Sequence, residues 1–143
     1  IAGGRQWWTH ELQTSFDKMK YKKDVVFTGR VSDDTLHRLT ASAFALTYVS
    51  FFEGFGIPII EAMQSGVPVI TSNVTSMPEV AGDAALLANP YDQVTIATAM
   101  QQLYYDENLR QSLIGRGFER ARLFSWDRSA ELLWNSISKT MTQ

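Results

Sequence analysis

The chain has 143 residues, of which 45% are hydrophobic and 20% are charged, and its formal net charge is −2. This length fits one domain, and the composition is that of an ordinary soluble globular domain, which excludes disorder of the whole chain. The absence of cysteine from the sequence excludes a disulfide scaffold and thiolate metal chemistry. With 13 Lys and Arg against 15 Asp and Glu, we expect no nucleic-acid binding. The longest apolar runs, such as 44–49, fall far below the roughly 20 residues of a membrane span, so we expect a cytoplasmic domain.

The first residues, Ile1-Ala2-Gly3-Gly4, are typical of the end of a β-strand that runs into a glycine turn. They carry no initiator Met, no charged leader region and no cleavage-site pattern. We therefore expect a fragment that begins inside a secondary-structure element. The expected organisation is one domain, 1–143, truncated at its N-terminal edge.

Hydrophobic periodicity predicts strands and helices in alternation. In chain order these are a strand at 1–3, a helix at 11–20, a strand at 24–28, a helix from the N-cap Ser32 to about 42, a strand at 44–49, a helix from 58 to 64, a strand at 67–71, a short helix at 78–81, a strand at 84–87, and helices at 92–105, 107–123 and from about 125 onward. Strands separated by helical segments indicate βαβ units, so we predict an α/β fold with a doubly wound parallel sheet and helices on both faces.

Residues 50–66 hold the pattern most indicative of chemistry. A predicted strand leads into a loop with Gly54 and Gly56 and then into a helix that begins near Pro58. Glycine lets the backbone approach a ligand closely, and a helix N-terminus offers unpaired N–H groups and a partial positive charge. Glu53 lies in the loop, and Glu61 follows eight residues later, one turn into the helix and directed back toward the same crevice.

Two carboxylates beside an anion site suit a ligand that carries both phosphate and hydroxyl groups, because ionised carboxylates accept hydrogen bonds from vicinal diols. A diphosphate flanked by two polyhydroxy rings, as in a nucleotide sugar, meets both demands. The alternative interpretation is that Gly54 and Gly56 only shape a turn and that Glu61 is a solvated helix residue.

The segment 53–63, Glu-Gly-Phe-Gly-Ile-Pro-Ile-Ile-Glu-Ala-Met, resembles the Glu-x7-Glu motif of the family 4 retaining glycosyltransferases. The resemblance covers nearly the whole chain in order, through 26–31, 66–70, 77–80, 82–85, 89–90 and 124–126. It implies a GT-B fold, in which two Rossmann-like domains face each other across a cleft and the C-terminal domain binds the nucleotide-sugar donor. This chain resembles only that C-terminal domain, so the expected partners are a nucleotide sugar and a missing N-terminal acceptor-binding domain of the same polypeptide.

The resemblance also assigns roles to residues. Glu53 is the candidate catalytic residue and lies against hydroxyls of the donor sugar, and Glu61 holds the ribose diol. The remaining contacts in this segment are backbone N–H groups near the sugar and diphosphate, from Gly54, Phe55, Gly56 and Ile57.

A second group of candidates precedes the predicted helix that begins after Ser32. By resemblance, Arg30 and Val31 line the base pocket, chiefly through their backbone. Asp33 or Asp34 accepts hydrogen bonds from a guanine edge, although both are also ordinary acids of a helix first turn, which is the interpretation we favour.

The family's donor domain begins with a strand and loop whose Arg and Lys grip the diphosphate. This chain lacks that segment, and Arg5 is poorly placed to replace it. We therefore expect weak binding of nucleotide sugars and no transfer activity from the chain alone.

The transfer reaction of the family needs no metal and no cofactor. The sequence agrees, since it has no Asp-x-Asp pair and only His10 and His37, of which His37 is expected at the surface. Two alternatives remain for the aromatic residues Trp7, Trp8 and the pair 51–52. They belong either to the core or to an apolar surface that a missing domain would cover.

The leading hypothesis is the donor-binding half of a retaining glycosyltransferase that moves a sugar from a GDP- or UDP-linked donor to an acceptor hydroxyl. The alternative is a non-catalytic nucleotide-sugar-binding or interaction module with the same fold. A third candidate, another GT-B enzyme such as a sugar phosphorylase or nucleotide-sugar epimerase, matches the architecture but not the full set of motifs. Membrane association is expected only through the parent protein, at the inner face of the membrane.

Overall fold

The computed structural model describes residues 1–4 and 8–141, which form two compact units, Ile1–Leu39 and Thr40–Gln143. The first unit holds helix α1 (His10–Lys18), the 3-10 turn η1 (Lys22–Asp24) and most of helix α2 (Asp33–Ala41). The rings of Trp8, Phe16 and Phe27 meet edge to face with centroids 5.9, 5.3 and 5.4 Å apart. Trp8 also donates a hydrogen bond from Nε1 to Gln13 at 2.8 Å. Trp8 is therefore half-buried in an aromatic cluster of its unit, while Trp7 lies outside the described residues.

The strands predicted at 1–3 and 24–28 are not formed as strands. The two segments do run parallel, since Thr28 N donates to Ile1 O at 3.0 Å and Gly3 N donates to Gly29 O at 2.9 Å. They share only one isolated bridge, between Ala2 and Gly29. The physical reason is local: η1 takes up the Val25 N–H, which donates to Lys22 O at 3.3 Å, so the run of β-branched residues enters the pairing late.

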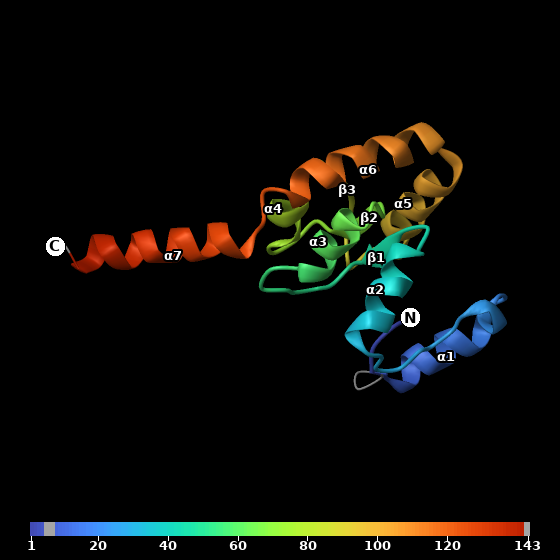
Figure 1. Ribbon diagram of the computed structural model, residues 1–143. Helices are drawn as coiled ribbons and strands as arrows, with labels where there is room; N and C mark the ends of the chain where they lie inside the picture. The colour runs from blue at the N-terminus through green and yellow to red at the C-terminus, as the bar shows by residue number, and fades with distance from the viewer. Residues whose placement is uncertain (5–7, 142–143) are drawn as a thin grey trace. The chain divides into compact units, whose positions relative to one another are not determined.

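The second unit contains, within the described residues, a three-stranded parallel sheet in the order β1-β2-β3. The strands are β1 (Leu46–Tyr48), β2 (Val69–Ser72) and β3 (Ala85–Ala88). The helices are α3 (Ile57–Gln64), α4 (Met77–Ala81), α5 (Gln93–Tyr105), α6 (Glu107–Ala121) and α7 (Trp126–Met141). Each strand is followed by a helix, as the alternating periodicity predicts (Figure 1).

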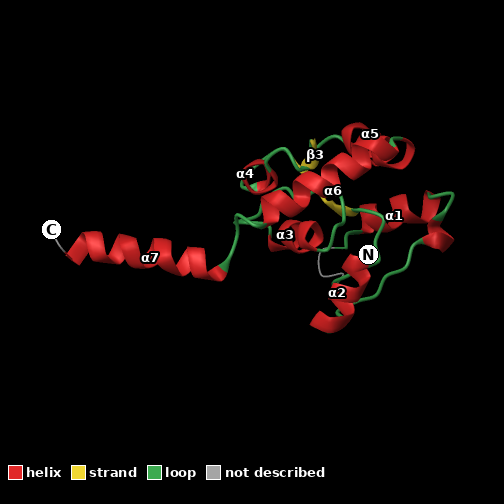
Figure 2. Cartoon of the chain, turned by 45° about the horizontal axis from the view of Figure 1, so that its top comes forward, coloured by secondary structure: helices red, strands yellow, loops and turns green. Residues whose placement is uncertain are grey.

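Alternate residues of β2 enter different cores. Val69 packs in a cluster with residues of α3 and α4, whereas Ile70 packs in a second cluster with Leu103 of α5 and Leu113 of α6. Because successive side chains of a strand point to opposite faces, the sheet is covered by helices on both faces. This arrangement confirms the predicted doubly wound α/β class (Figure 2).

The helix ends follow the sequence signals. The Ser32 hydroxyl accepts from Thr35 N at 3.3 Å, which confirms its cap position before α2. Asp92 and Asp106 cap α5 and α6, accepting from Val94 N and Leu109 N at 2.9 Å each. Ser65 and Gly66 close α3, and Gly66 takes the left-handed conformation at φ +69°.

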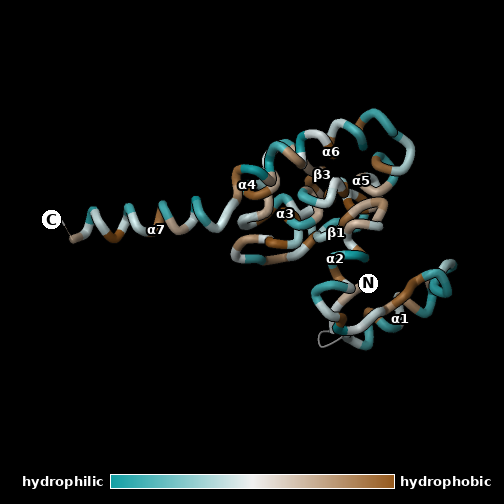
Figure 3. The backbone as a smooth tube through the Cα atoms, in the orientation of Figure 1, coloured by the Kyte–Doolittle hydropathy of each residue, from teal (hydrophilic) through white to brown (hydrophobic). Residues whose placement is uncertain are grey.

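Helix α7 has no buried residue. Its apolar side chains recur at helical spacing, including Leu133, Trp134 and Ile137, which are 63%, 66% and 42% exposed. Hydrophobic and hydrophilic colours alternate along the α7 tube (Figure 3). None of the helices in the described part of the chain combines the length and apolar character that a bilayer crossing requires. The stripe on α7 is therefore an apolar surface on a helix that carries polar residues on its other sides.

Arg120 connects the last turn of α6 to α4. Its Nε donates to Val80 O at 3.0 Å, its Nη2 donates to Glu79 O, and its guanidinium lies 5.2 Å from the centre of the Phe124 ring. We expect Arg120→Ala to lower the free energy of unfolding by about 2 kcal/mol, because two carbonyl groups lose a charged donor.

The matched control for this prediction is Arg122→Ala. Arg122 forms an exposed pair with Glu119 at 2.7 Å, which is worth at most about 0.5 kcal/mol. Urea unfolding followed by circular dichroism measures both changes. Equal losses in the two variants would show that Arg120 does not hold α4.

Candidate functional site

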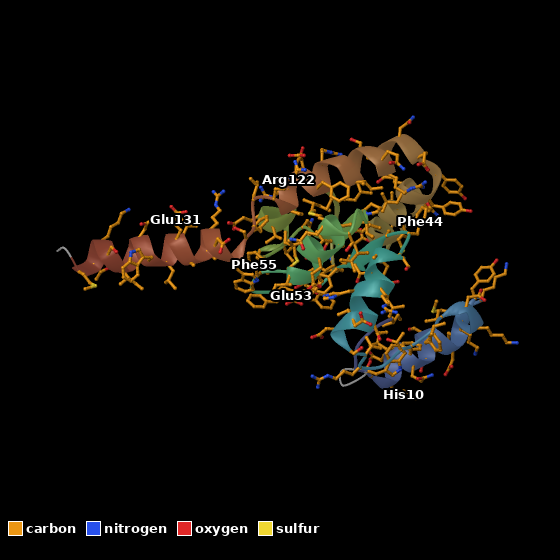
Figure 4. The ribbon with its side chains drawn as sticks, in the orientation of Figure 1. His10, Phe44, Glu53, Phe55, Arg122 and Glu131 are labelled. Atoms are coloured by element: carbon orange, nitrogen blue, oxygen red, sulfur yellow. The ribbon has the colours of Figure 1, made fainter. Side chains whose placement is uncertain are left out.

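The loop after β1 brings together most of the site residues predicted from sequence. It runs from the carboxyl end of β1 to the first turn of α3, which is the edge where parallel sheets bind ligands. Glu53 is half-buried in this loop, and Phe55 projects beside it (Figure 4). One carboxylate oxygen of Glu53, Oε1, accepts two hydrogen bonds, from Tyr48 Oη at 2.6 Å and from Ser50 Oγ at 3.1 Å.

The backbone of the loop is fixed from the neighbouring strand connection. Ser76 Oγ lies 2.9 Å from Glu53 O and 3.0 Å from Phe55 O and donates to this pair of carbonyls. Thr75, directly before it, has φ +58°, a left-handed conformation that is uncommon for a β-branched residue. A strained residue held next to a loop contact indicates that the surrounding structure determines its position.

The N-terminus of α3 presents unpaired backbone donors. Gly56 is the N-cap, at φ +108°, and no side chain caps the helix. Within the described residues, the N–H groups of Gly54, Phe55, Gly56 and Ile57 have no hydrogen-bond acceptor. Since Pro58 has no N–H to add, these amides are the donors that an anion would meet at this helix end.

Glu61 lies on the open side of α3. It is one turn after Ile57, so both occupy the same helix face, and Ile57 is 52% exposed. The opposite face is buried in the core through Ile59 and Met63, at 0% and 1% exposure. The Glu61 carboxylate is half-buried and has no side-chain partner among the described residues. It is thus available to a ligand that lies along the start of α3.

Aromatic side chains flank the loop. The Phe55 ring meets the Phe124 ring edge to face at 5.7 Å, and the Phe51 ring lies 5.0 Å from Tyr91. Phe51 and Phe52 are 61% and 78% exposed, so they belong to the apolar surface and not to the core.

The second group of predicted residues belongs to the first unit. Arg30 is exposed, Val31 is half-buried, and Asp33 is exposed in the first turn of α2. Asp34 pairs with Arg38 one turn on, at 3.2 Å. Both acids lie in the first turn of α2, where Ser32 is the cap, and the roles of Asp33, Asp34, Arg30 and Val31 toward a base stay predictions.

Two further residues were singled out from sequence. His37 is exposed on α2, which confirms the surface position expected for it. Arg5 lies outside the described residues. Among the residues that the structure describes, no group of three or more His, Cys, Asp or Glu side chains could hold a metal ion.

Sequence reasoning missed the residues that hold Glu53. The sequence pattern predicts Tyr48 only as a strand residue, although a tyrosine that points to the core side of a strand requires a partner for its hydroxyl. Ser76 stands 23 residues after Glu53, and no local pattern connects them.

An apolar groove of about 440 Å³ lies elsewhere in the second unit. It is lined by residues at the start of β1 and on α5, including Phe44, Ala45, Met100 and Tyr104. Because it opens beside the amino end of β1, it does not include the loop that carries Glu53.

The parallel sheet, with a loop and a helix N-terminus at its carboxyl edge and helices on both faces, is the architecture of doubly wound α/β domains. The chain belongs to the Glycosyl transferases group 1 family, whose sequence pattern matches residues 1–120. It is 41% identical over 127 residues to O-antigen chain mannosyltransferase B of Escherichia coli, an alignment that covers 89% of this chain and 33% of that protein. The chain thus spans about a third of the length of this curated relative.

Solved structures agree on the fold. Sucrose-phosphate synthase from Thermosynechococcus elongatus superimposes with a TM-score of 0.79 at 25% identity, covering 98% of this chain and 37% of that one. HepE from Anabaena, solved in complex with UDP and glucose, superimposes with a TM-score of 0.84 at 20% identity, covering 96% of this chain and 39% of that one. The domain has the fold of the GT-B glycosyltransferases.

Proposed function

We propose that the chain is the C-terminal, donor-binding domain of a family 4 retaining glycosyltransferase. Its ligand is a GDP- or UDP-linked sugar, from which the complete enzyme moves the sugar to an acceptor hydroxyl. The observation that carries this proposal is the combination of unpaired amides at 54–57 with two carboxylates, Glu53 and Glu61, on the same loop and helix. A ligand with a diphosphate between two hydroxyl-bearing rings matches both kinds of group.

In this assignment each group has a distinct task. The α3 amides and the positive end of the helix dipole stabilise the charge of the diphosphate, which grows as the sugar leaves. Glu53 accepts hydrogen bonds from sugar hydroxyls and holds the ring in place, while Glu61 accepts those of the ribose. In this proposal the residues of the site act without a metal ion and without a cofactor.

The names of the relatives support the transfer of a sugar. The share of their length that this chain covers supports a longer parent polypeptide. Several relatives are mannosyltransferases by name, and the chain spans only about a third of one of them. We propose that the rest of such a polypeptide supplies the acceptor-binding domain, which would cover exposed apolar residues such as Phe51, Phe52 and Trp134. The parent enzyme would be cytoplasmic or peripheral at the inner face of the membrane, and this chain alone would not catalyse transfer.

Isothermal titration with GDP, UDP, GDP-mannose and UDP-glucose tests donor binding. We expect one of the two nucleotide series to bind with a Kd on the order of 0.1–1 mM, equivalent to about −4 to −5.5 kcal/mol. We expect weak affinity because the proposed diphosphate contacts are neutral backbone amides, which bind anions less strongly than charged side chains do. A heat of binding with the nucleotide sugars, together with no transfer of sugar to any acceptor, fits the proposal.

A folded sample that gives no heat with any of the four ligands contradicts donor binding by this chain. The control is the same titration on a longer protein that also carries the family's upstream strand and basic loop. If that protein also fails to bind, a non-catalytic interaction module becomes the better description.

A further inference from the structure

The carboxylate of Glu53 is held asymmetrically. Both of its hydrogen bonds, from Tyr48 Oη at 2.6 Å and Ser50 Oγ at 3.1 Å, reach the same oxygen, Oε1. Within the described residues Oε2 has no hydrogen-bond partner. Because an ionised carboxylate only accepts, the tyrosine and serine hydroxyls are both donors here, and one lone-pair-rich oxygen stays unoccupied.

The residue that donates the shorter bond is itself fixed. Tyr48 is the last residue of β1, and its backbone O accepts from Thr71 Oγ1 at 2.9 Å. Thr71 is fully buried in the central strand, at 0% exposure. The Tyr48 ring packs against the buried cluster of α3 and α4, so both ends of the side chain are constrained. The donor therefore reaches Glu53 from the rigid sheet and not from the loop.

The electrostatics keep Tyr48 a donor. Burial first, then the hydrogen bond to Glu53 and the negative charge of that carboxylate, raise the pKa of Tyr48 from 10.0 to about 12, while the nearby Ser50 hydroxyl acts in the opposite direction. A raised pKa means that the folded state favours the neutral phenol. This stabilisation is fully present below pH 10 and is lost as the pH rises through about 12. At neutral pH the phenol keeps its proton and continues to donate.

We infer that Tyr48, assisted by Ser50, is a positioning residue that fixes Oε1 of Glu53 and thereby aims Oε2 at a hydroxyl group of the donor sugar. This inference rests on the proposed function, since it assigns a mechanism of sugar recognition to the same site. It makes Tyr48 act through Glu53 without touching the ligand. Tyr48 should therefore affect the sugar portion of the ligand and not the nucleotide portion.

The test is the affinity of Tyr48→Phe for the nucleotide sugar and for the bare nucleoside diphosphate, measured by titration. We expect the nucleotide sugar to bind about fivefold more weakly and the bare diphosphate to bind within about twofold of the unmodified chain. Tyr91→Phe is the matched control, because it removes the same hydroxyl from an exposed ring beside the loop. Ser50→Thr keeps a hydroxyl and should retain affinity, whereas Ser50→Ala should lose part of it.

A double-mutant cycle separates positioning from a merely structural role. If Tyr48 acts through Glu53, Tyr48→Phe causes no further loss in a Glu53→Gln background. Additive losses, or equal weakening of nucleotide and nucleotide sugar, would overturn the inference. So would a Tyr48→Phe variant that binds both ligands like the unmodified chain.

A ligand-free measurement distinguishes the two proposals. Ultraviolet titration of tyrosine should show one phenol ionising near pH 12, and Glu53→Gln should lower that pKa only in part, because burial, the largest cause of the shift, remains. If this shift is seen but no nucleotide binds, the hydrogen bond stands, while the proposed function and the positioning role both fail. If nucleotides bind but Glu53→Gln leaves the Tyr48 pKa unchanged, only the positioning role fails.

Discussion

Replacing Glu53 by glutamine is expected to weaken binding of the nucleotide sugar about tenfold and to leave binding of the bare nucleoside diphosphate nearly unchanged. Glutamine has nearly the shape of glutamate but loses the negative charge that strengthens hydrogen bonds from sugar hydroxyls. Its amide group also donates, so it no longer presents two accepting oxygens. Competition titration against the bare nucleotide measures the difference.

The control for Glu53 is Glu131→Gln. Glu131 is exposed on α7, so the same loss of one negative charge occurs away from the loop (Figure 4). We expect no change in affinity for either ligand. If Glu53→Gln and the control behave alike, or if Glu53→Gln weakens the bare nucleotide equally, then Glu53 does not face the sugar.

Replacing Gly56 by alanine is expected to lower the free energy of unfolding by about 3 kcal/mol. Gly56 has φ +108°, where L residues are strained, and a Cβ there would lie 3.1 Å from Ile59 Cδ1 and 3.3 Å from Met77 Cε. Both neighbours are fully buried, so neither can move away freely. The substitution would also displace the amides at the start of α3 and so abolish diphosphate binding.

Gly54→Ala is the matched control, on the same loop. A Cβ at Gly54 would meet nothing within 4 Å, and Gly54 does not have a positive φ. We expect a change within about 0.5 kcal/mol, measured by urea unfolding of both variants. Similar stability of the two alanine variants would contradict the structural role given to Gly56.

The sequence best predicts the bounds of those helices that have a capping residue next to them in the chain. The helix predicted at 92–105 is found at Gln93–Tyr105, because Asp92 caps it locally and Asp106 already caps the next helix. The strand predicted at 24–28 fails because a 3-10 turn competes for its first N–H group, and β-propensity alone does not reveal that competition.

The same division applies to the candidate site. Glu53, Gly56 and Glu61 are close in sequence, so a loop glycine, a helix-starting proline and a helical spacing suffice to predict their arrangement. The supports of Glu53 depend on tertiary structure. Tyr48 reaches it across the end of a strand, and Ser76 reaches its backbone from the following strand connection. Such contacts are fixed by the register of the parallel sheet, which short sequence patterns do not encode.

The central claim is that the loop after β1 and the first turn of α3 bind a nucleotide sugar. Two-dimensional amide NMR of the labelled chain, titrated with GDP-mannose and UDP-glucose, tests it most directly, since weak binding is still seen as shifted signals. We predict the largest shifts at Gly54, Phe55, Gly56, Ile57 and Glu61. Absence of shifts at these amides, or shifts confined to the groove formed by 44–47 and 100–105, would contradict the account.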